Sequence, residues 1–134
     1  MEIFRCGLPT LRILASVDQR KPLFGGVSAY VGDGLNRWPA VHRLDAAHLY
    51  RLALEKGSAP ARYNAVAEEG VQLREIAEAI GRRLKVPVVA MSPEEAGEHF
   101  GWFGGLVGFD VPASSALTQE RLGWRPTQIG RFLA

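Results

Sequence analysis

The sequence predicts a mixed α/β fold of short strands and helices, and three observations lead to it. The 134-residue chain is long enough for one domain and too short for two ordinary ones. Its hydrophobic residues make up 47% and its charged residues 22%, as in globular domains, so we expect a packed core. From residue 27 onward, runs typical of strands alternate with segments of helical periodicity. We therefore expect one domain over residues 27–134, preceded by a leader segment, residues 1–26, that matches no pattern.

The first element after the leader is predicted to be a β-hairpin. Val27–Val31 favours a strand, and the Gly32-Asp33-Gly34 run that follows is a strong turn signal. The return strand is expected over Asn36–His42, where Pro39 predicts a sheet edge or a bulge because it has no N–H. Two further short strands are expected, over Arg62–Ala67 and Pro87–Met91.

A helix is predicted after the hairpin, because apolar residues recur there with helical spacing. Asp45 is expected to cap its N-terminus, and Gly57 to end it in a left-handed conformation. The side chains expected in its buried stripe are Ala46, Leu49, Tyr50 and Ala53.

Three more helices follow from the pattern. Leu73–Leu84 has apolar residues at helical spacing and an outer Glu78–Arg82 pair. Ser92-Pro93, followed by two glutamates, is typical of a helix start. The last helix is expected over Ser115–Leu122.

Composition argues against several classes of function. No apolar run approaches the 18 residues of a membrane span, and no signal-peptide pattern is visible, so we expect a cytoplasmic protein. Sixteen basic residues against fourteen acidic ones give a net charge of +2, too little to indicate a nucleic-acid partner. The single cysteine, Cys6, has no companion for a disulfide or a thiolate metal site.

The histidines form no local metal motif, because His42, His48 and His99 lie far apart in the sequence. His48 falls on the polar side of its helix and is interpreted as a surface residue. His42 closes a strand three residues before Asp45. We expect it to anchor the strand-to-helix junction by hydrogen bonds, with a role at a ligand pocket as the alternative.

Gly101–Gly108 is rich in glycine and aromatic residues. A phosphate-binding loop requires a strand, a glycine turn and then a helix whose N-terminal amides hold the phosphate. Here a predicted helix precedes the glycines, so we interpret the segment as a flexible aromatic loop or lid.

Four features recur together in one known family. They are the Gly32-Asp33-Gly34 turn, the Val41-His42 pair, the Asp45-Ala46-Ala47 helix start and the Leu122-Gly123-Trp124-x-Pro126 ending. With the helix-forming segment Val71–Leu84, they resemble the carboxy-terminal half of the extended short-chain dehydrogenases/reductases, the NAD-dependent epimerase/dehydratase group. The resemblance covers residues 27–134.

The resemblance implies a partial Rossmann-like, substrate-facing lobe without the nucleotide-binding βαβ half. In that family a glycine turn binds NAD or NADP, and a Tyr-x-x-x-Lys pair transfers the proton. No lysine lies four residues after Tyr30, Tyr50 or Tyr63, and the leader is too short for a βαβ unit. We therefore expect no catalytic residue and no cofactor in the isolated chain, and NAD or NADP in a complete family member.

The resemblance also implies that Asn36–His42 lines or supports the substrate cleft. The candidate substrate-binding residues are Asn36, Arg37, Trp38 and His42. Many sugar-nucleotide epimerases carry an arginine where Trp38 stands, which disfavours a nucleotide sugar here and leaves an aromatic or apolar substrate open. Trp38 either stacks on a ligand or is an exposed residue of a domain interface.

Three functions are compatible with these features. The leading one is a truncated NAD(P)-dependent oxidoreductase or epimerase that keeps the lobe for a small-molecule substrate and is not competent alone. The first alternative is a non-catalytic interaction module that self-associates through an exposed apolar face. The second is a half-enzyme completed in trans by a separate nucleotide-binding chain. Neither nucleic acid nor a membrane is expected as a partner.

Overall fold

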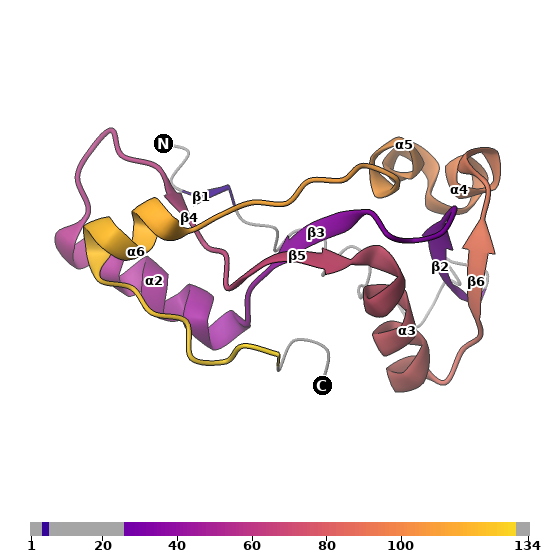
Figure 1. Ribbon diagram of the computed structural model, residues 1–134, viewed down its shortest axis with the longest axis horizontal. Helices are drawn as coiled ribbons and strands as arrows, with labels where there is room; N and C mark the ends of the chain where they lie inside the picture. The colour runs from indigo at the N-terminus through magenta and orange to yellow at the C-terminus, as the bar shows by residue number, and fades with distance from the viewer. Residues whose placement is uncertain (1–3, 6–25, 131–134) are drawn as a thin grey trace.

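The computed structural model describes residues 4–5 and 26–130 (Figure 1). Its strands are β1 (Phe4–Arg5), β2 (Ser28–Val31), β3 (Arg37–Ala40), β4 (Tyr63–Asn64), β5 (Glu68–Gln72) and β6 (Val88–Met91). Its helices are α2 (Arg43–Lys56), α3 (Leu73–Leu84), α4 (Pro93–Phe100), the 3-10 turn η1 (Gly101–Phe103), α5 (Gly104–Val107) and α6 (Ala116–Leu122). The predicted mixed α/β class with short elements is confirmed. Cys6 and most of the expected leader lie outside the described residues.

The elements gather at two ends of an elongated molecule (Figure 1). One end holds α2, α6 and β4, and the other holds β2, β6, α3, α4 and α5. The antiparallel pair β3–β5 joins the two ends, and the segment between α5 and α6 runs beside it. Backbone hydrogen bonds fix this segment, since Val111 N donates to Arg37 O at 2.8 Å and Ala113 N donates to Glu69 O at 3.0 Å.

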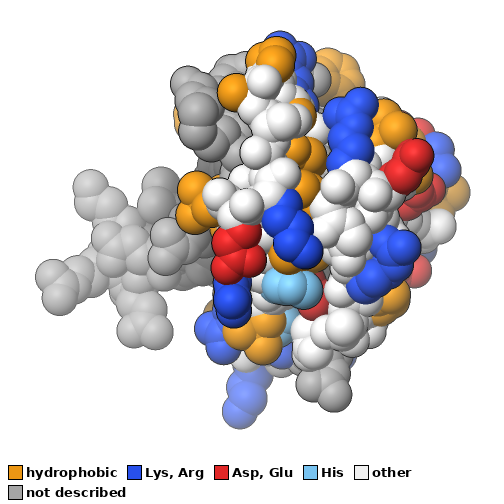
Figure 2. Space-filling view, turned by 90° about the vertical axis from the view of Figure 1, so that its left-hand side faces the viewer, with side chains coloured by type: hydrophobic (Ala, Val, Ile, Leu, Met, Phe, Trp, Pro, Cys, Tyr) orange, Lys and Arg blue, Asp and Glu red, His pale blue; other side chains and the backbone are white. Residues whose placement is uncertain are grey.

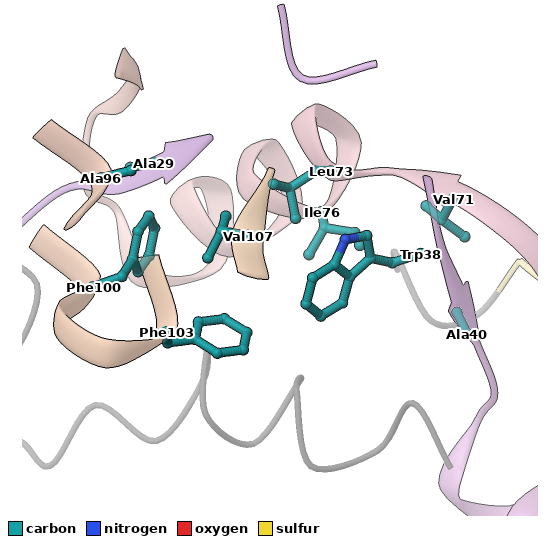
Figure 3. Close-up of a cluster of buried hydrophobic side chains, with 10 residues drawn as sticks. All are labelled: Ala29, Trp38, Ala40, Val71, Leu73, Ile76, Ala96, Phe100, Phe103 and Val107. Atoms are coloured by element: carbon teal, nitrogen blue, oxygen red, sulfur yellow. The ribbon is translucent and has the colours of Figure 1, made fainter. Parts of the chain in front are cut away.

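Each end has its own buried hydrophobic cluster. The first cluster consists of Ala29, Trp38, Ala40, Val71, Leu73, Ile76, Ala96, Phe100, Phe103 and Val107 (Figure 3). The second consists of Val41, Ala46, Leu49, Tyr63, Ala65, Leu122 and Trp124. The chain therefore passes from one cluster to the other through the strands β3 and β5. None of the described helices is long and apolar enough to cross a membrane.

Four of the strands, β2, β3, β4 and β6, fall within segments predicted to be strands, whereas β5 was not predicted and the predicted hairpin is wrong. β2 pairs in parallel with β6, and β3 pairs antiparallel with β5. The turn itself forms, because Gly34 N donates to Val31 O at 3.0 Å with Gly34 at φ +69°. It directs β3 away from β2 instead of folding it back. Pro39 does coincide with a bulge, since the β3–β5 register shifts between Trp38 and Ala40.

The start and the end of α2 both differ from expectation. His42 is the N-cap, with Nδ1 accepting from Leu44 N at 3.3 Å, so the assignment of the cap to Asp45 is wrong. Gly57 at the C-cap is extended at φ −68°, so the predicted left-handed end is also wrong. Ala46 and Leu49 are buried as predicted, whereas Tyr50 is exposed.

The other predicted helices are confirmed. α3 has the predicted bounds, although its outer ion pair joins Arg74 to Glu78 at 3.0 Å instead of Glu78 to Arg82. α4 begins with a capping box in which Ser92 and Glu95 bind each other's backbone N–H. α6 begins one residue after its N-cap, Ser115.

The predicted lid over Gly101–Gly108 is wrong, because the segment folds into η1 and α5. Phe103 and Val107 are buried in the first cluster (Figure 3). A Cβ atom at Gly104 would lie 2.5 Å from Ala96 O, so a glycine is required for α5 to approach α4. This glycine serves close packing of two helices rather than flexibility.

Gly104 and Gly105 provide a matched pair of variants. We expect Gly104→Ala to lower the free energy of unfolding by about 1–3 kcal/mol, because the added methyl overpacks the α4–α5 contact. Gly105→Ala places its methyl in open space and is expected to stabilise by about 0.4–1 kcal/mol. Urea unfolding followed by circular dichroism measures both. Equal effects of the two variants would contradict the close approach of α5 to α4.

Candidate functional site

Three of the predicted binding residues lie together at the start of β3, against the segment that follows α5. Asn36 Nδ2 donates to Val107 O at 2.8 Å and to Phe109 O at 3.0 Å. Trp38 Nε1 donates to the same Phe109 O at 2.9 Å. The amide and the indole thus hold the chain after α5 onto β3. This segment is a part of the candidate site that the sequence did not reveal.

Arg37 binds Asp110 through its backbone and its side chain. The backbone N donates to Asp110 Oδ1 at 2.6 Å, Nε donates to the same oxygen at 3.1 Å, and Nη2 donates to Oδ2 at 2.8 Å. Both side chains are about half exposed, so solvent or a ligand reaches the guanidinium. The hydrogen bonds from Arg37 lower the pKa of Asp110, and the same contact raises the pKa of Arg37. The pair offers an exposed, planar cation held in a defined orientation.

The Arg37–Asp110 contact predicts a pH dependence. Because the pKa of Asp110 is lowered in the folded chain, its stabilisation is present above the ordinary aspartate pKa and is lost as pH falls through the lowered value. We therefore expect Asp110→Asn to lower the unfolding midpoint at neutral pH, and the difference from wild type to shrink on acidification. Urea midpoints measured at several pH values test this. A difference that grows on acidification would contradict the contact.

Trp38 is buried, with 8% of its surface exposed. Its ring packs edge-on against Phe103 with the ring centroids 5.8 Å apart. In Figure 3 it points into the first cluster. The interpretation of Trp38 as an exposed interface residue is therefore wrong. Its direct contact with a ligand stays a prediction.

His42 lies at the far end of β3 from the other three residues. Three residues separate it from Trp38, and His42 itself lies two residues beyond the end of β3. Its hydrogen bond to Leu44 N confirms the expected anchor of the strand-to-helix junction. Contact of His42 with a ligand stays a prediction.

Asp45 has a role that the sequence reasoning missed. Its buried carboxylate accepts hydrogen bonds from Thr127 N at 3.0 Å, Thr127 Oγ1 at 3.2 Å and Gln128 N at 2.8 Å. Its backbone O accepts from Trp124 Nε1 at 3.0 Å. Asp45 thereby clamps the segment after α6 to the first turn of α2. The Asp45-Ala46-Ala47 and Leu122-Gly123-Trp124-x-Pro126 motifs were the only hint of this contact in the sequence. In the structure the two motifs lie against each other.

The remaining titratable groups form no metal centre within the part of the chain that the structure describes. His48 is exposed, as predicted. His99 is partly buried, and burial lowers the pKa of its imidazole.

The chain is similar to two curated proteins, both uncharacterized. It is 60% identical over 102 residues to a protein of Schizosaccharomyces pombe, and 49% identical over 105 residues to one of Saccharomyces cerevisiae. The matches cover 76% and 78% of this chain, but 35% of each relative. The chain thus spans about a third of the length of these relatives. No protein-family model matches it.

Three solved structures share the fold. DesIV, a dTDP-glucose 4,6-dehydratase of Streptomyces venezuelae solved with NAD and TYD bound, matches with a TM-score of 0.54 and 22% identity over 77% of this chain. RMD of Pseudomonas aeruginosa, in complex with NADPH, matches with a TM-score of 0.52 and 16% identity over 87% of this chain. The third, gox2253, has a TM-score of 0.51 and 21% identity over 90% of this chain.

This chain matches only a part of each of the three solved structures. This chain covers 30%, 40% and 38% of DesIV, RMD and gox2253, respectively. The described residues therefore form a mixed α/β fold that matches part of the Rossmann-like folds of DesIV, RMD and gox2253. This agrees with the predicted fold class.

Proposed function

We propose that residues 27–134 form the substrate-facing lobe of an NAD(P)-dependent oxidoreductase or epimerase of the extended short-chain dehydrogenase/reductase group. In this proposal the chain does not turn over substrate by itself. The observation that carries the proposal is the coverage: most of this chain matches the folds of DesIV, RMD and gox2253, but only 30–40% of those chains is matched. The 134-residue sequence also has neither a Tyr-x-x-x-Lys pair nor the glycine turn of the family.

The contacts at the start of β3 suggest how such a lobe would meet a small-molecule substrate. Asn36 and Trp38 fix the segment after α5, and this segment carries Asp110, the partner of Arg37. The half-exposed guanidinium would then orient a negatively charged or hydrogen-bond-accepting group of the substrate. Trp38 in place of an arginine disfavours a nucleotide sugar and leaves an aromatic or apolar substrate open.

The cofactor of the complete enzyme is proposed to be NAD or NADP. The structures of DesIV and RMD hold NAD and NADPH, which supports this class of cofactor. The nucleotide-binding half would be supplied by residues outside this sequence, in the same polypeptide or in a separate chain.

Reconstitution with the missing half tests the proposal. The 134-residue chain is co-expressed with the part of the S. pombe relative that lies outside the 102 matched residues. We expect the purified pair to bind NADPH at micromolar concentrations, as measured by the fluorescence of the nicotinamide. The relative's part purified alone is the control for NADPH binding without the lobe. A purified, folded pair that binds neither NADPH nor NAD+ would overturn the proposal.

A further inference from the structure

The strand β6 forms an open edge of its sheet. Among the described residues, β6 pairs with β2 and with no other strand. Its four residues are all apolar and include neither a charged residue nor a proline. Charged residues and proline are what usually protects an exposed strand edge from pairing with another chain. Figure 1 shows β6 at one end of the molecule, on the outer side of β2.

The hydrogen bonds between β2 and β6 show which backbone groups of β6 point inward. Ser28 N donates to Pro87 O at 2.8 Å, and Gly32 N donates to Met91 O at 2.9 Å. Because a strand in a parallel pair uses every second residue toward the same neighbour, Val89 faces β2 as well.

The other two residues of β6 therefore direct their backbone outward. The N–H and C=O groups of Val88 and Ala90 point away from β2, and no backbone group of the described residues bonds to them. Both residues are exposed to solvent. An extended strand satisfies such a row of donors and acceptors, whereas the side of a helix, with its own groups already paired, does not. The edge is therefore suited to an extended segment.

The edge is complementary to a second copy of itself. In an antiparallel pair, two opposite residues exchange both of their N–H···O bonds. When two copies of β6 run antiparallel, Val88 of each copy faces Ala90 of the other, and Val89 lies at the two-fold axis. All outward groups of both strands are then bonded. The side chains of Val88 and Ala90 also meet, because they lie on the same face of the sheet.

The charges that flank β6 favour this antiparallel orientation. Arg82 and Lys85 are exposed shortly before the strand, at the end of α3. Glu94 and Glu95 are exposed shortly after it, in the first turn of α4. Antiparallel pairing places the basic end of one copy beside the acidic end of the other, whereas parallel pairing places like charges together. At the end of the molecule where α2 lies, basic, acidic and hydrophobic side chains are intermixed instead (Figure 2).

We propose that the chain forms a two-fold symmetric dimer in which the β6 edges of two copies pair antiparallel. The inference does not depend on the proposed function, because it requires neither a nucleotide-binding half nor a substrate. Each copy contributes only a short strand, so we expect a weak dimer with a dissociation constant of about 10–100 μM.

Sedimentation equilibrium of the full 134-residue chain, measured over a concentration series, tests the proposal. Ala90→Pro removes an outward N–H from each strand, and proline is tolerated at a strand edge, so we expect a dissociation constant raised by about tenfold or more. Ala90→Ser is the matched control, because it keeps the N–H at the same position and should leave the constant unchanged. Circular dichroism checks that each variant is folded.

Charge reversal tests the orientation without altering β6. Lys85→Glu and Glu94→Lys each place like charges together across the two-fold axis, and each is expected to weaken the dimer by about two- to tenfold. The double variant brings opposite charges together again, so it should recover most of the lost affinity.

The outcomes decide the proposal in either direction. A dimer that Ala90→Pro weakens and Ala90→Ser does not, and whose affinity the double charge variant recovers, supports it. A wild-type chain that stays monomeric throughout the concentration series overturns it. A dimer that a folded Ala90→Pro leaves unchanged also overturns it, because the contact then lies elsewhere. If Ala90→Pro does not fold, the charge variants decide, and a double variant no tighter than the single ones overturns the antiparallel pairing.

Discussion

Trp124→Ala is expected to lower the free energy of unfolding by about 3–5 kcal/mol, because it removes a large side chain from a packed core. The side chain of Trp124 is completely buried in the second cluster, beside Leu49 and Leu122. Its indole Nε1 also donates to Asp45 O at 3.0 Å, so the variant loses a buried hydrogen bond together with the apolar contacts. Alanine would leave a cavity between α2 and α6 that the short elements around it cannot close.

Urea unfolding of the full chain, followed by circular dichroism, measures this loss. Trp102→Ala is the matched control, because Trp102 is 78% exposed. We expect the control to change the free energy of unfolding by less than about 1 kcal/mol. Similar losses for the two tryptophans would contradict the position of Trp124 in the second cluster.

Asp45→Ala is expected to lower the free energy of unfolding by about 2–4 kcal/mol, because two backbone N–H groups lose a charged acceptor. These are the N–H groups of Thr127 and Gln128. Water would not readily replace the carboxylate as their acceptor, since Asp45 is buried. The segment after α6 should therefore detach from α2 in this variant.

Two further aspartate variants test whether the Asp45 carboxylate holds the segment after α6 against α2. Asp45→Asn keeps one side-chain oxygen as an acceptor and should destabilise less than Asp45→Ala. Asp33→Ala is the control at an exposed turn, where Asp33 Oδ1 accepts from Leu35 N at 3.0 Å. Hydrogen exchange should show faster exchange of the Thr127 and Gln128 amides in Asp45→Ala and not in Asp33→Ala. Unchanged protection of these two amides would rule out the clamp.

The elements that the sequence predicts correctly are those whose signals are local. α3 follows from apolar residues repeated within one helix, and α4 from Ser92-Pro93 with two glutamates after it. Such signals depend on neighbouring residues, so they can be read without knowing the tertiary contacts. The cap of α2 was assigned wrongly because the carboxylate of Asp45 binds Thr127 and Gln128, far along the chain, and His42 caps the helix instead.

The partners of the strands could not be predicted from the sequence, because they depend on contacts between distant residues. Ser28 pairs with Val88, and Arg37 with Gln72, although the turn after β2 is an ordinary hairpin signal. The prediction at Gly104 was wrong for a similar reason. A glycine-rich run indicates flexibility unless a second element packs against it, and here α4 does so.

The candidate site was predicted in part. Asn36, Arg37 and Trp38 are adjacent in sequence and necessarily lie together. The segment after α5, which these three residues bind, is distant in sequence. Arg37 and its partner Asp110 are 73 residues apart. No local pattern indicates that contact, nor the burial of Trp38 against Phe103. The sequence therefore indicated one strand of the site and missed the segment that completes it.

The most direct measurement is a fluorescence titration of the 134-residue chain alone with NADPH, repeated by calorimetry with NAD+. If the chain is a substrate-facing lobe whose nucleotide-binding half lies elsewhere, neither dinucleotide binds at micromolar concentrations, although circular dichroism shows the chain to be folded. Saturable micromolar binding of NADPH or NAD+ by the folded chain alone would contradict the proposed function.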